Sequence, residues 1–159
     1  MRRQVLFVCT GNVFRSLTAE YALRAALAHR GDISVASAGT EDYAHIVAPQ
    51  IAEYLRQKNL DVSRHVRRTL TREIADQAHL LVAMSVEHRD FIRARFGRSA
   101  PLFLECCGEA PEALLDLHEA VRDHRINPAA ALAYIHATID RIIELTPRLA
   151  RRLDILLAS

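Results

Sequence analysis

The sequence of 159 residues contains no tryptophan, a single lysine (Lys58) and only three cysteines, and its apolar runs are short. An odd number of cysteines without a framework spacing excludes a disulfide-stapled secreted domain and predicts a reducing compartment. Apolar runs far shorter than about 20 residues exclude a membrane-spanning helix. The first apolar run follows residues 1–4 directly, so we expect no room for a signal peptide. These absences predict a cytoplasmic protein without a membrane partner.

The sequence also lacks a large excess of either positive or negative charge. The formal net charge is +2, which predicts no nucleic-acid partner because a binding domain of that kind carries a strong basic footprint. The arginine-rich segment 64–72 is best interpreted as solvated surface, with a flank for an anionic ligand as the alternative. The eight histidines show no metal-ligand spacing such as His-Glu-x-x-His. We therefore expect neither a metal site nor a cofactor.

The apolar content that is present suffices for one hydrophobic core. Half of the residues are hydrophobic and a quarter are charged, as in ordinary globular domains. A chain of this length suits one domain and buries roughly two thirds of its surface on folding. Neither an internal repeat nor a linker-like segment interrupts the sequence. We expect residues 1–159 to form a single domain.

Apolar runs alternate with helical patterns along the chain, which is typical of an α/β domain with a mainly parallel sheet. Strands are expected at residues 4–9, 33–36, 80–84 and 101–105. Helices are expected at residues 16–29 and 47–58, after Thr71, between Ser85 and Gly97, and from Pro128 onward, where Pro147 should break or restart the last helix while its apolar face continues. The sequence thus predicts a four-stranded parallel sheet in the order 2-1-3-4 with helices on both faces.

Residues 8–16, Val-Cys-Thr-Gly-Asn-Val-Phe-Arg-Ser, lie between the first apolar run and the first helical pattern. The backbone N–H groups of such a loop point at one spot, and the dipole of the following helix adds partial positive charge there. This cradle suits a tetrahedral oxyanion, and Arg15 can bind two of its oxygens through its planar guanidinium. Cys9 is expected to be a thiolate that attacks the bound phosphorus. The phosphate-binding residues are expected to be Thr10, Gly11, Asn12, Val13, Phe14, Arg15 and Ser16.

The Cys-x5-Arg-Ser pattern, with Thr-Gly-Asn inside it and a strand directly before it, resembles the loop of the low-molecular-weight protein tyrosine phosphatases. Thioredoxin-coupled arsenate reductases share that fold and loop. The resemblance implies hydrolysis of phosphomonoesters, above all protein phosphotyrosine, through a phosphocysteine intermediate, with inorganic phosphate as the product. It also implies that Asn12 holds a strained loop backbone and that Ser16 donates a hydrogen bond to the thiolate of Cys9.

The same resemblance extends to three residues beyond the loop. The segment Ser-Ala-Gly-Thr at residues 37–40 matches the family in a turn after its second strand, so Ser37 is expected to brace the phosphate loop. His65 loosely matches a family histidine that stabilises the same network. Tyr43 stands where the family places an aromatic wall for the substrate ring.

The general acid is harder to assign, because the family places it in an Asp-Pro pair and this sequence contains none. A group of this kind must protonate the leaving oxygen and then activate water. Asp123 fits best by position, since it lies shortly before the helix start at Asn127 and Pro128. Asp116 and Glu119 stay open as alternatives.

Cys106 and Cys107 follow the expected fourth strand directly. Adjacent cysteines make a strained disulfide, and a packing role is the simpler interpretation. A redox role would favour arsenate reduction, which is the rival enzyme class. A phosphate-binding module without turnover is the rival outside enzymes, because the Asp-Pro pair is absent.

Overall fold

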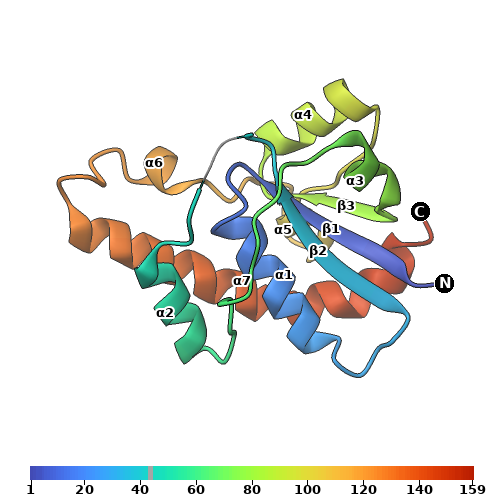
Figure 1. Cartoon of the computed structure of the whole chain (residues 1–159), viewed down its shortest axis with the longest axis horizontal. Helices are drawn as coiled ribbons and strands as arrows, with labels where there is room; N and C mark the ends of the chain where they lie inside the picture. Colours follow the sequence, from blue (N-terminus) through green and yellow to red (C-terminus); the bar gives the residue numbers. More distant parts are fainter. Residues whose placement is uncertain (43–44) are drawn as a thin grey trace.

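The computed structural model describes residues 1–42 and 45–159. At its centre is a parallel sheet in the order β2-β1-β3 (Figure 1), formed by β1 (Arg3–Cys9), β2 (Ile33–Gly39) and β3 (Leu80–Ala83). The middle strand is buried from residue 5 to residue 9, as expected of a parallel strand that is covered on both faces. The α/β fold and the order of the first three strands are confirmed.

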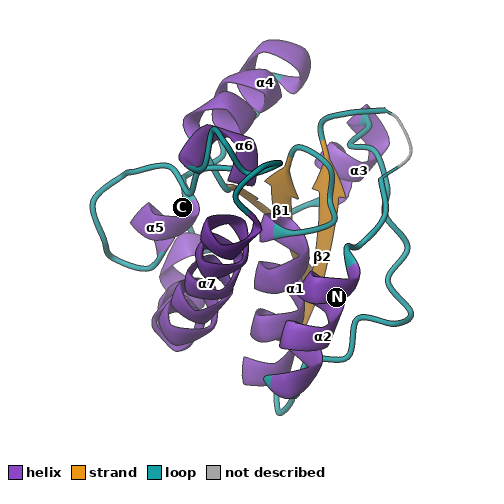
Figure 2. Cartoon of the chain, turned by 90° about the vertical axis from the view of Figure 1, so that its left-hand side faces the viewer, coloured by secondary structure: helices purple, strands orange, loops and turns teal. Residues whose placement is uncertain are grey.

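Helices cover both faces of the sheet, as predicted. They are α1 (Arg15–Ala26), α2 (Pro49–Gln57), α3 (Arg72–Gln77), α4 (Val86–Phe96), α5 (Phe103–Cys106), α6 (Leu117–Ala120) and α7 (Pro128–Leu156). Successive side chains of a strand point to opposite faces. Val5 and Phe7 accordingly pack with α1, α5 and α7, whereas Leu6 and Val8 pack with α3 and α4. Figures 1 and 2 show these two layers, with α1 and α7 side by side below the sheet of Figure 1.

The prediction of a fourth strand at residues 101–105 is wrong, although this segment does lie at the predicted fourth position of the sheet. Leu102 makes a single parallel bridge to Ala83, and the chain then turns into α5 at Phe103. Residues 102–104 are apolar and fully buried, whereas Glu105 is exposed. Hydrophobic periodicity cannot separate such a short run in a strand from one turn of a buried helix. The described part of the sheet therefore has three strands, with Leu102 at the fourth position.

The last helix also differs from the prediction, because Pro147 lies inside α7 and does not break it. Proline removes one backbone donor from a helix, and the hydroxyl of Thr146 donates to the carbonyl of Ile142 at 2.6 Å in the same turn. Leu145, Leu149 and Leu153 are buried in the core on both sides of the proline. Packing of this apolar stripe keeps the helix continuous.

Several helix ends agree with the sequence. The Thr71 side chain caps α3, Asn127 caps α7, and Gly97 ends α4 in the left-handed conformation. None of the helices built from residues 1–42 and 45–159 combines the length and apolarity needed to cross a lipid bilayer.

Candidate active site

The phosphate loop, residues 9–16, joins the carboxyl end of β1 to the start of α1. Ligands of parallel α/β sheets bind at this edge. Cys9 and Arg15 are each only 2% exposed, so both lie at the base of the site. Asn12 has a φ of 59°, which confirms the strained backbone expected there. Gly11 carries no positive φ; a Cβ on it would lie 3.2 Å from the His45 ring, so close packing explains this glycine.

A hydrogen-bond chain orients the thiol of Cys9. Its Sγ lies 2.9 Å from Oγ of Ser16, and the Asn12 side-chain amide donates to the same Oγ at 2.9 Å. That oxygen accepts from Asn12 and has one hydrogen of its own, which it can donate to the sulfur when Cys9 is a thiolate. The second amide hydrogen of Asn12 goes to Ser37 Oγ at 2.7 Å. Ser37 is therefore bonded to the loop through Asn12, at the position where the family resemblance led us to expect a supporting residue.

The chain continues to a buried carboxylate that sequence reasoning missed. Ser37 donates to Oε2 of Glu20 at 2.9 Å, and Glu20 is 4% exposed. His65 Nδ1 lies 3.6 Å from the same oxygen, while its Nε2 lies 2.8 Å from the backbone oxygen of Asn12. His65 thus contacts the strained residue directly, as predicted. Glu20 falls within a helical pattern, where a charged residue normally marks the solvent face, so no signal singled it out.

Two arginines of segment 64–72 also support the loop, which corrects their interpretation as a solvated face. Arg67 donates to the backbone oxygens of Gly11 and Glu41 at 3.1 and 2.7 Å. The backbone N–H of Arg68 donates to Oδ1 of Asn12 at 3.1 Å, and its side chain donates to the oxygen of Ser37. The charged side chains of these two arginines thus stabilise the loop and its neighbours through hydrogen bonds to backbone carbonyls.

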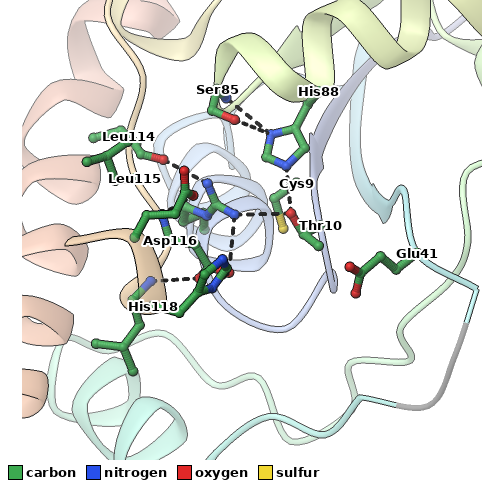
Figure 3. A network of polar contacts seen from close by, with 12 residues as sticks. Cys9, Thr10, Glu41, Ser85, His88, Leu114, Leu115, Asp116 and His118 are labelled. Atoms are coloured by element: carbon green, nitrogen blue, oxygen red, sulfur yellow. Dashed lines mark hydrogen bonds and ion pairs between the residues drawn. The ribbon is translucent and has the colours of Figure 1, made fainter. Parts of the chain in front are cut away.

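Arg15 is tied to the far side of the site. Its Nη1 donates to the backbone oxygen of Leu114 at 2.8 Å, and its Nη2 lies 3.7 Å from Oδ2 of Asp116. The backbone N–H of Leu114 donates in turn to Met84, just beyond β3. The buried guanidinium therefore joins the phosphate loop to the segment that carries the candidate acids (Figure 3).

A second buried group missed from the sequence is His88 in the first turn of α4. Its Nε2 lies 2.9 Å from Oγ1 of Thr10, and its Nδ1 contacts the backbone N and Oγ of Ser85. Burial, with the nearby charge of Arg15, lowers the pKa of His88 to about 3, so the ring is neutral at ordinary pH. The capping position of Ser85 was predicted, but nothing in the sequence shows that the histidine three residues later reaches the loop.

A pocket of about 200 Å³ opens above Cys9. The phosphate loop forms its floor, and Glu41, His45, Asp116 and His118 line its walls. Asp116 caps α6 and accepts from the N–H of Leu117, while Nδ1 of His118 lies 3.1 Å from its Oδ2. Figure 3 shows Cys9, Asp116 and His118 around this opening. Tyr43, the expected aromatic wall, lies outside the described residues.

Of the three candidate acids, only Asp116 lines this pocket. Asp123, the residue favoured from the sequence, is exposed and accepts a 3.4 Å hydrogen bond from the side chain of Asn127. Glu119 instead accepts from the backbone N–H of Asp116 at 3.0 Å. Asp116 and Glu119 form a capping box, and the spacing Asp-x-x-Glu is a sequence signal for a helix start. That signal could have placed Asp116 at the head of a helix and not in an open loop.

The remaining cysteines, Cys106 and Cys107, are both fully buried. Burial raises the pKa of each thiol to about 12, so they are neutral and unreactive. They pack in the core with side chains of β1 and α7. Across residues 1–42 and 45–159, histidine, cysteine and carboxylate side chains form no group of three that could hold a metal ion.

Similarity to known proteins agrees with this geometry. The model of the family described as low molecular weight phosphotyrosine protein phosphatase matches residues 4–154. The chain belongs to this family. The "Probable low molecular weight protein-tyrosine-phosphatase EpsP" of Ralstonia solanacearum is 30% identical over 142 residues, which are 88% of this chain and 93% of that protein.

Other relatives carry other names. The "Protein-arginine-phosphatase" of Bacillus subtilis is 35% identical over 96 residues, 59% of this chain, and the match spans 63% of that protein. An arsenate reductase of Staphylococcus xylosus is 33% identical over 89 residues, 56% of this chain and 65% of the reductase. Among solved structures, a YwlE mutant from Bacillus subtilis is 27% identical with a TM-score of 0.80, covering 96% of this chain and 99% of the other. A mutant YwlE arginine phosphatase with a phosphorylated active-site serine is 28% identical with a TM-score of 0.78, and the match covers 95% of each chain.

These similarities confirm the expected fold and enzyme class, a cysteine-dependent phosphatase of the low molecular weight family. Its substrates are accordingly phosphorylated proteins or small phosphate compounds. The roles of individual residues rest on the geometry described above.

Proposed function

We propose that this chain hydrolyses phosphotyrosine on proteins in two steps, with Cys9 as nucleophile, Arg15 as phosphate clamp and Asp116 as general acid and base. The observation that carries the proposal is that the thiol, the guanidinium and the carboxyl group line one pocket of about 200 Å³. Each group has the chemistry that one part of phosphoryl transfer requires.

In the first step the Cys9 thiolate attacks phosphorus. A sulfur–phosphorus bond forms while the bond from phosphorus to the phenolic oxygen breaks, and the protonated carboxyl of Asp116 gives its proton to that oxygen. Arg15 and the N–H groups at the start of α1 bind the equatorial oxygens, whose charge is spread in the transition state. The buried contacts of the loop fix the positions of these donor groups before the substrate binds.

In the second step water attacks the phosphocysteine. The carboxylate of Asp116 takes a proton from the water, the sulfur–phosphorus bond breaks, and inorganic phosphate leaves. Ser16 contacts the sulfur at 2.9 Å, so its hydroxyl stabilises the thiolate as leaving group. Asp116 is then protonated again and Cys9 is a thiolate again, which is the starting state for the next turnover.

The geometry moves our assignment of the acid from Asp123 to Asp116. Asp116 lines the pocket and lies 3.7 Å from Arg15, whereas Asp123 is exposed and contacts Asn127. A general acid must reach the leaving oxygen directly or through one water. The same placement argues against a phosphate-binding module without turnover, because a suitable acid faces the cradle.

Phosphotyrosine is favoured as substrate because the nucleophile lies deep. Cys9 is 2% exposed, so a phosphorylated side chain must be long to reach it. The imidazoles of His45 and His118 line the pocket walls and offer flat faces to an aromatic ring.

Phosphoarginine is a second candidate, and one wall residue favours it. Glu41 presents a carboxylate on the pocket, which can accept hydrogen bonds from a guanidinium group. A relative that covers 59% of this chain is named a protein-arginine-phosphatase.

Arsenate reduction is disfavoured by the two other cysteines. A thioredoxin-coupled reductase passes oxidation from its loop cysteine to further reactive thiols, whereas Cys106 and Cys107 are buried with pKa values near 12. We place the phosphatase in the cytoplasm, because a reactive thiol needs a reducing compartment.

The experiment is a panel of four substrates: a phosphotyrosine peptide, a phosphoarginine peptide, a phosphoserine peptide and arsenate with a thioredoxin system. We expect phosphotyrosine to have the highest kcat/KM and arsenate consumption to be negligible. A preference for phosphoarginine would establish the second candidate. Thioredoxin-dependent arsenate reduction, without peptide hydrolysis, would overturn the phosphatase proposal.

A further inference from the structure

His88 is fully buried in the first turn of α4, although both of its ring nitrogens are polar. Nδ1 contacts Ser85 and Nε2 contacts Thr10 of the phosphate loop, and Figure 3 shows the ring between these two residues. Nothing in the two-step reaction described above uses this histidine. Its position between a helix cap and the catalytic loop calls for an account of which nitrogen carries the hydrogen.

The backbone N–H of Ser85 fixes the tautomer. This group can only donate, and it points at Nδ1 of His88 at 3.2 Å. Nδ1 must therefore accept, and in a neutral ring the hydrogen then resides on Nε2. Since burial keeps the ring neutral, Nε2–H donates to Oγ1 of Thr10 at 2.9 Å.

The acceptor capacity of Thr10 is filled from two sides. A hydroxyl oxygen has two lone pairs and one hydrogen to donate. Oγ1 of Thr10 accepts from His88 and also from Nη2 of Arg15 at 3.4 Å. What this hydroxyl can still do is donate, and Thr10 lines the pocket beside Cys9 and Arg15.

We propose that the Thr10 hydroxyl donates a hydrogen bond to a non-bridging oxygen of the phosphoryl group, and that His88 is the positioning residue that holds the hydroxyl in this orientation. The inference rests on the proposed phosphatase function and adds a side-chain donor to the backbone amides of the loop. Because the equatorial oxygens gain their spread of charge in the transition state, the bond should act on kcat more than on KM.

The competing account is that His88 only caps α4. Ser85 and His88 form a capping box, in which the ring accepts from the backbone of Ser85. A residue with this role alone would affect the stability of the fold and leave the chemical step unchanged.

Two substitutions at position 88 separate these accounts. A glutamine can place an amide N–H near the position of Nε2, and so keeps the donor to Thr10. An asparagine can place its oxygen near Nδ1, and so keeps the cap but loses that donor. We expect His88→Gln to retain kcat within about threefold and His88→Asn to lower kcat by about ten- to a hundredfold, the lower range for a lost oxyanion donor. Wild-type kcat in His88→Asn, or equal loss in both variants, would overturn the inference.

Thr10 supplies a second test if the variants of the buried histidine do not fold. Thr10→Ser keeps the hydroxyl and should stay within about threefold of wild type, whereas Thr10→Val should lose as much kcat as His88→Asn. The double variant Thr10→Val/His88→Asn should be no slower than Thr10→Val alone, because both changes remove the same bond. Unchanged kcat in Thr10→Val, or losses that multiply in the double variant, would contradict the assignment.

A binding measurement keeps this inference distinct from the proposed function. Orthovanadate imitates the five-coordinate phosphoryl group, and calorimetry measures its affinity without turnover. We expect Thr10→Val to weaken it about tenfold. If wild type hydrolyses none of the four substrates and Thr10→Val still weakens vanadate, the function fails and the Thr10 contact stands. If wild type is active and Thr10→Val binds vanadate normally, the contact alone is refuted.

Discussion

Oδ2 of Asp116 lies 3.7 Å from Nη2 of Arg15, and the same guanidinium donates to the backbone oxygen of Leu114 two residues earlier. The phosphate clamp therefore also holds the segment that carries the proposed acid. In the family that this sequence resembles, a proline follows the acid, whereas Leu117 follows Asp116 here. The buried arginine, together with the capping box of Asp116 and Glu119, provides the restraint that the proline would otherwise give.

The first prediction concerns that acid. Asp116→Asn should slow phenyl phosphate hydrolysis by about a hundredfold or more, since a poor leaving group needs its proton most. It should slow para-nitrophenyl phosphate much less. Rates measured across a series of substituted phenyl phosphates give this dependence on the leaving group.

Asp123→Asn and Glu119→Gln are the matched controls, and both should keep the wild-type dependence. A steep dependence in Asp123→Asn would return the role to the residue that the sequence favoured. If none of the three variants shows it, no carboxylate of this segment acts as the acid.

The second prediction concerns the nucleophile. Cys9→Ser should lose all measurable turnover while still binding phosphate, because a serine hydroxyl is not ionised near neutral pH. Calorimetric titration with inorganic phosphate, beside a stopped hydrolysis assay, tests both parts. Substantial residual hydrolysis would exclude the covalent route.

The third prediction separates charge from shape at Arg15. Arg15→Lys keeps the charge but offers no planar pair of donors, so kcat/KM should fall by roughly a hundredfold or more. Arg56→Lys, at an exposed arginine whose Nη2 pairs with Glu53 at 2.7 Å, is the control and should change kcat/KM by less than about threefold. Near-normal kinetics in Arg15→Lys would show that this side chain does not bind the phosphate.

The fourth prediction follows from the buried ring of His88. Its pKa is lowered from 6.5 to about 3 in the folded chain by burial and by Arg15. Between these pH values the unfolded chain binds a proton at this residue and the folded chain does not. The free energy of unfolding should therefore fall as the pH drops below about 6.5, with a limiting slope of about 1.4 kcal/mol per pH unit from this group.

Urea denaturation at pH 7.5 and pH 5 measures that change. His88→Gln lacks the titrating ring, so its stability should decline less than that of wild type over the same interval. Identical declines in the two proteins would mean that His88 protonates alike in the folded and unfolded chains.

Sequence patterns predicted the parts of this protein that depend on local chemistry. The strand, loop and helix around Cys9 and the caps at Thr71 and Asn127 follow from residue types at short spacing, whereas the contacts of Ser37 and His65 with the loop were expected from the family resemblance. The sequence analysis missed contacts between residues that are far apart in the sequence. Glu20 and His88 lie on helices whose orientation decides whether a polar side chain faces the solvent or the loop, and no local pattern states that orientation.

The two misplaced elements have a similar cause. Residues 102–104 are apolar and buried, so a bridge followed by a helical turn looks like a strand in the sequence. Pro147 follows a local rule that the packing of α7 overrides. Asp123 was favoured over Asp116 because it lies closer in sequence to the helix start at Asn127. The structure has an additional short helix, α6, between Asp116 and Asp123.

The loop at Cys9 is close to the amino terminus, yet the contacts that shape it come from much later in the chain. Gly39 packs so tightly against it that a Cβ there would lie 2.6 Å from the backbone oxygen of Thr10. Arg68 and Leu114 add bonds to Asn12 and Arg15. The loop around the nucleophile therefore reaches its full set of contacts only when residues as far along the chain as Leu114 have folded onto it. The return of activity after dilution from denaturant should accordingly report completion of the whole domain.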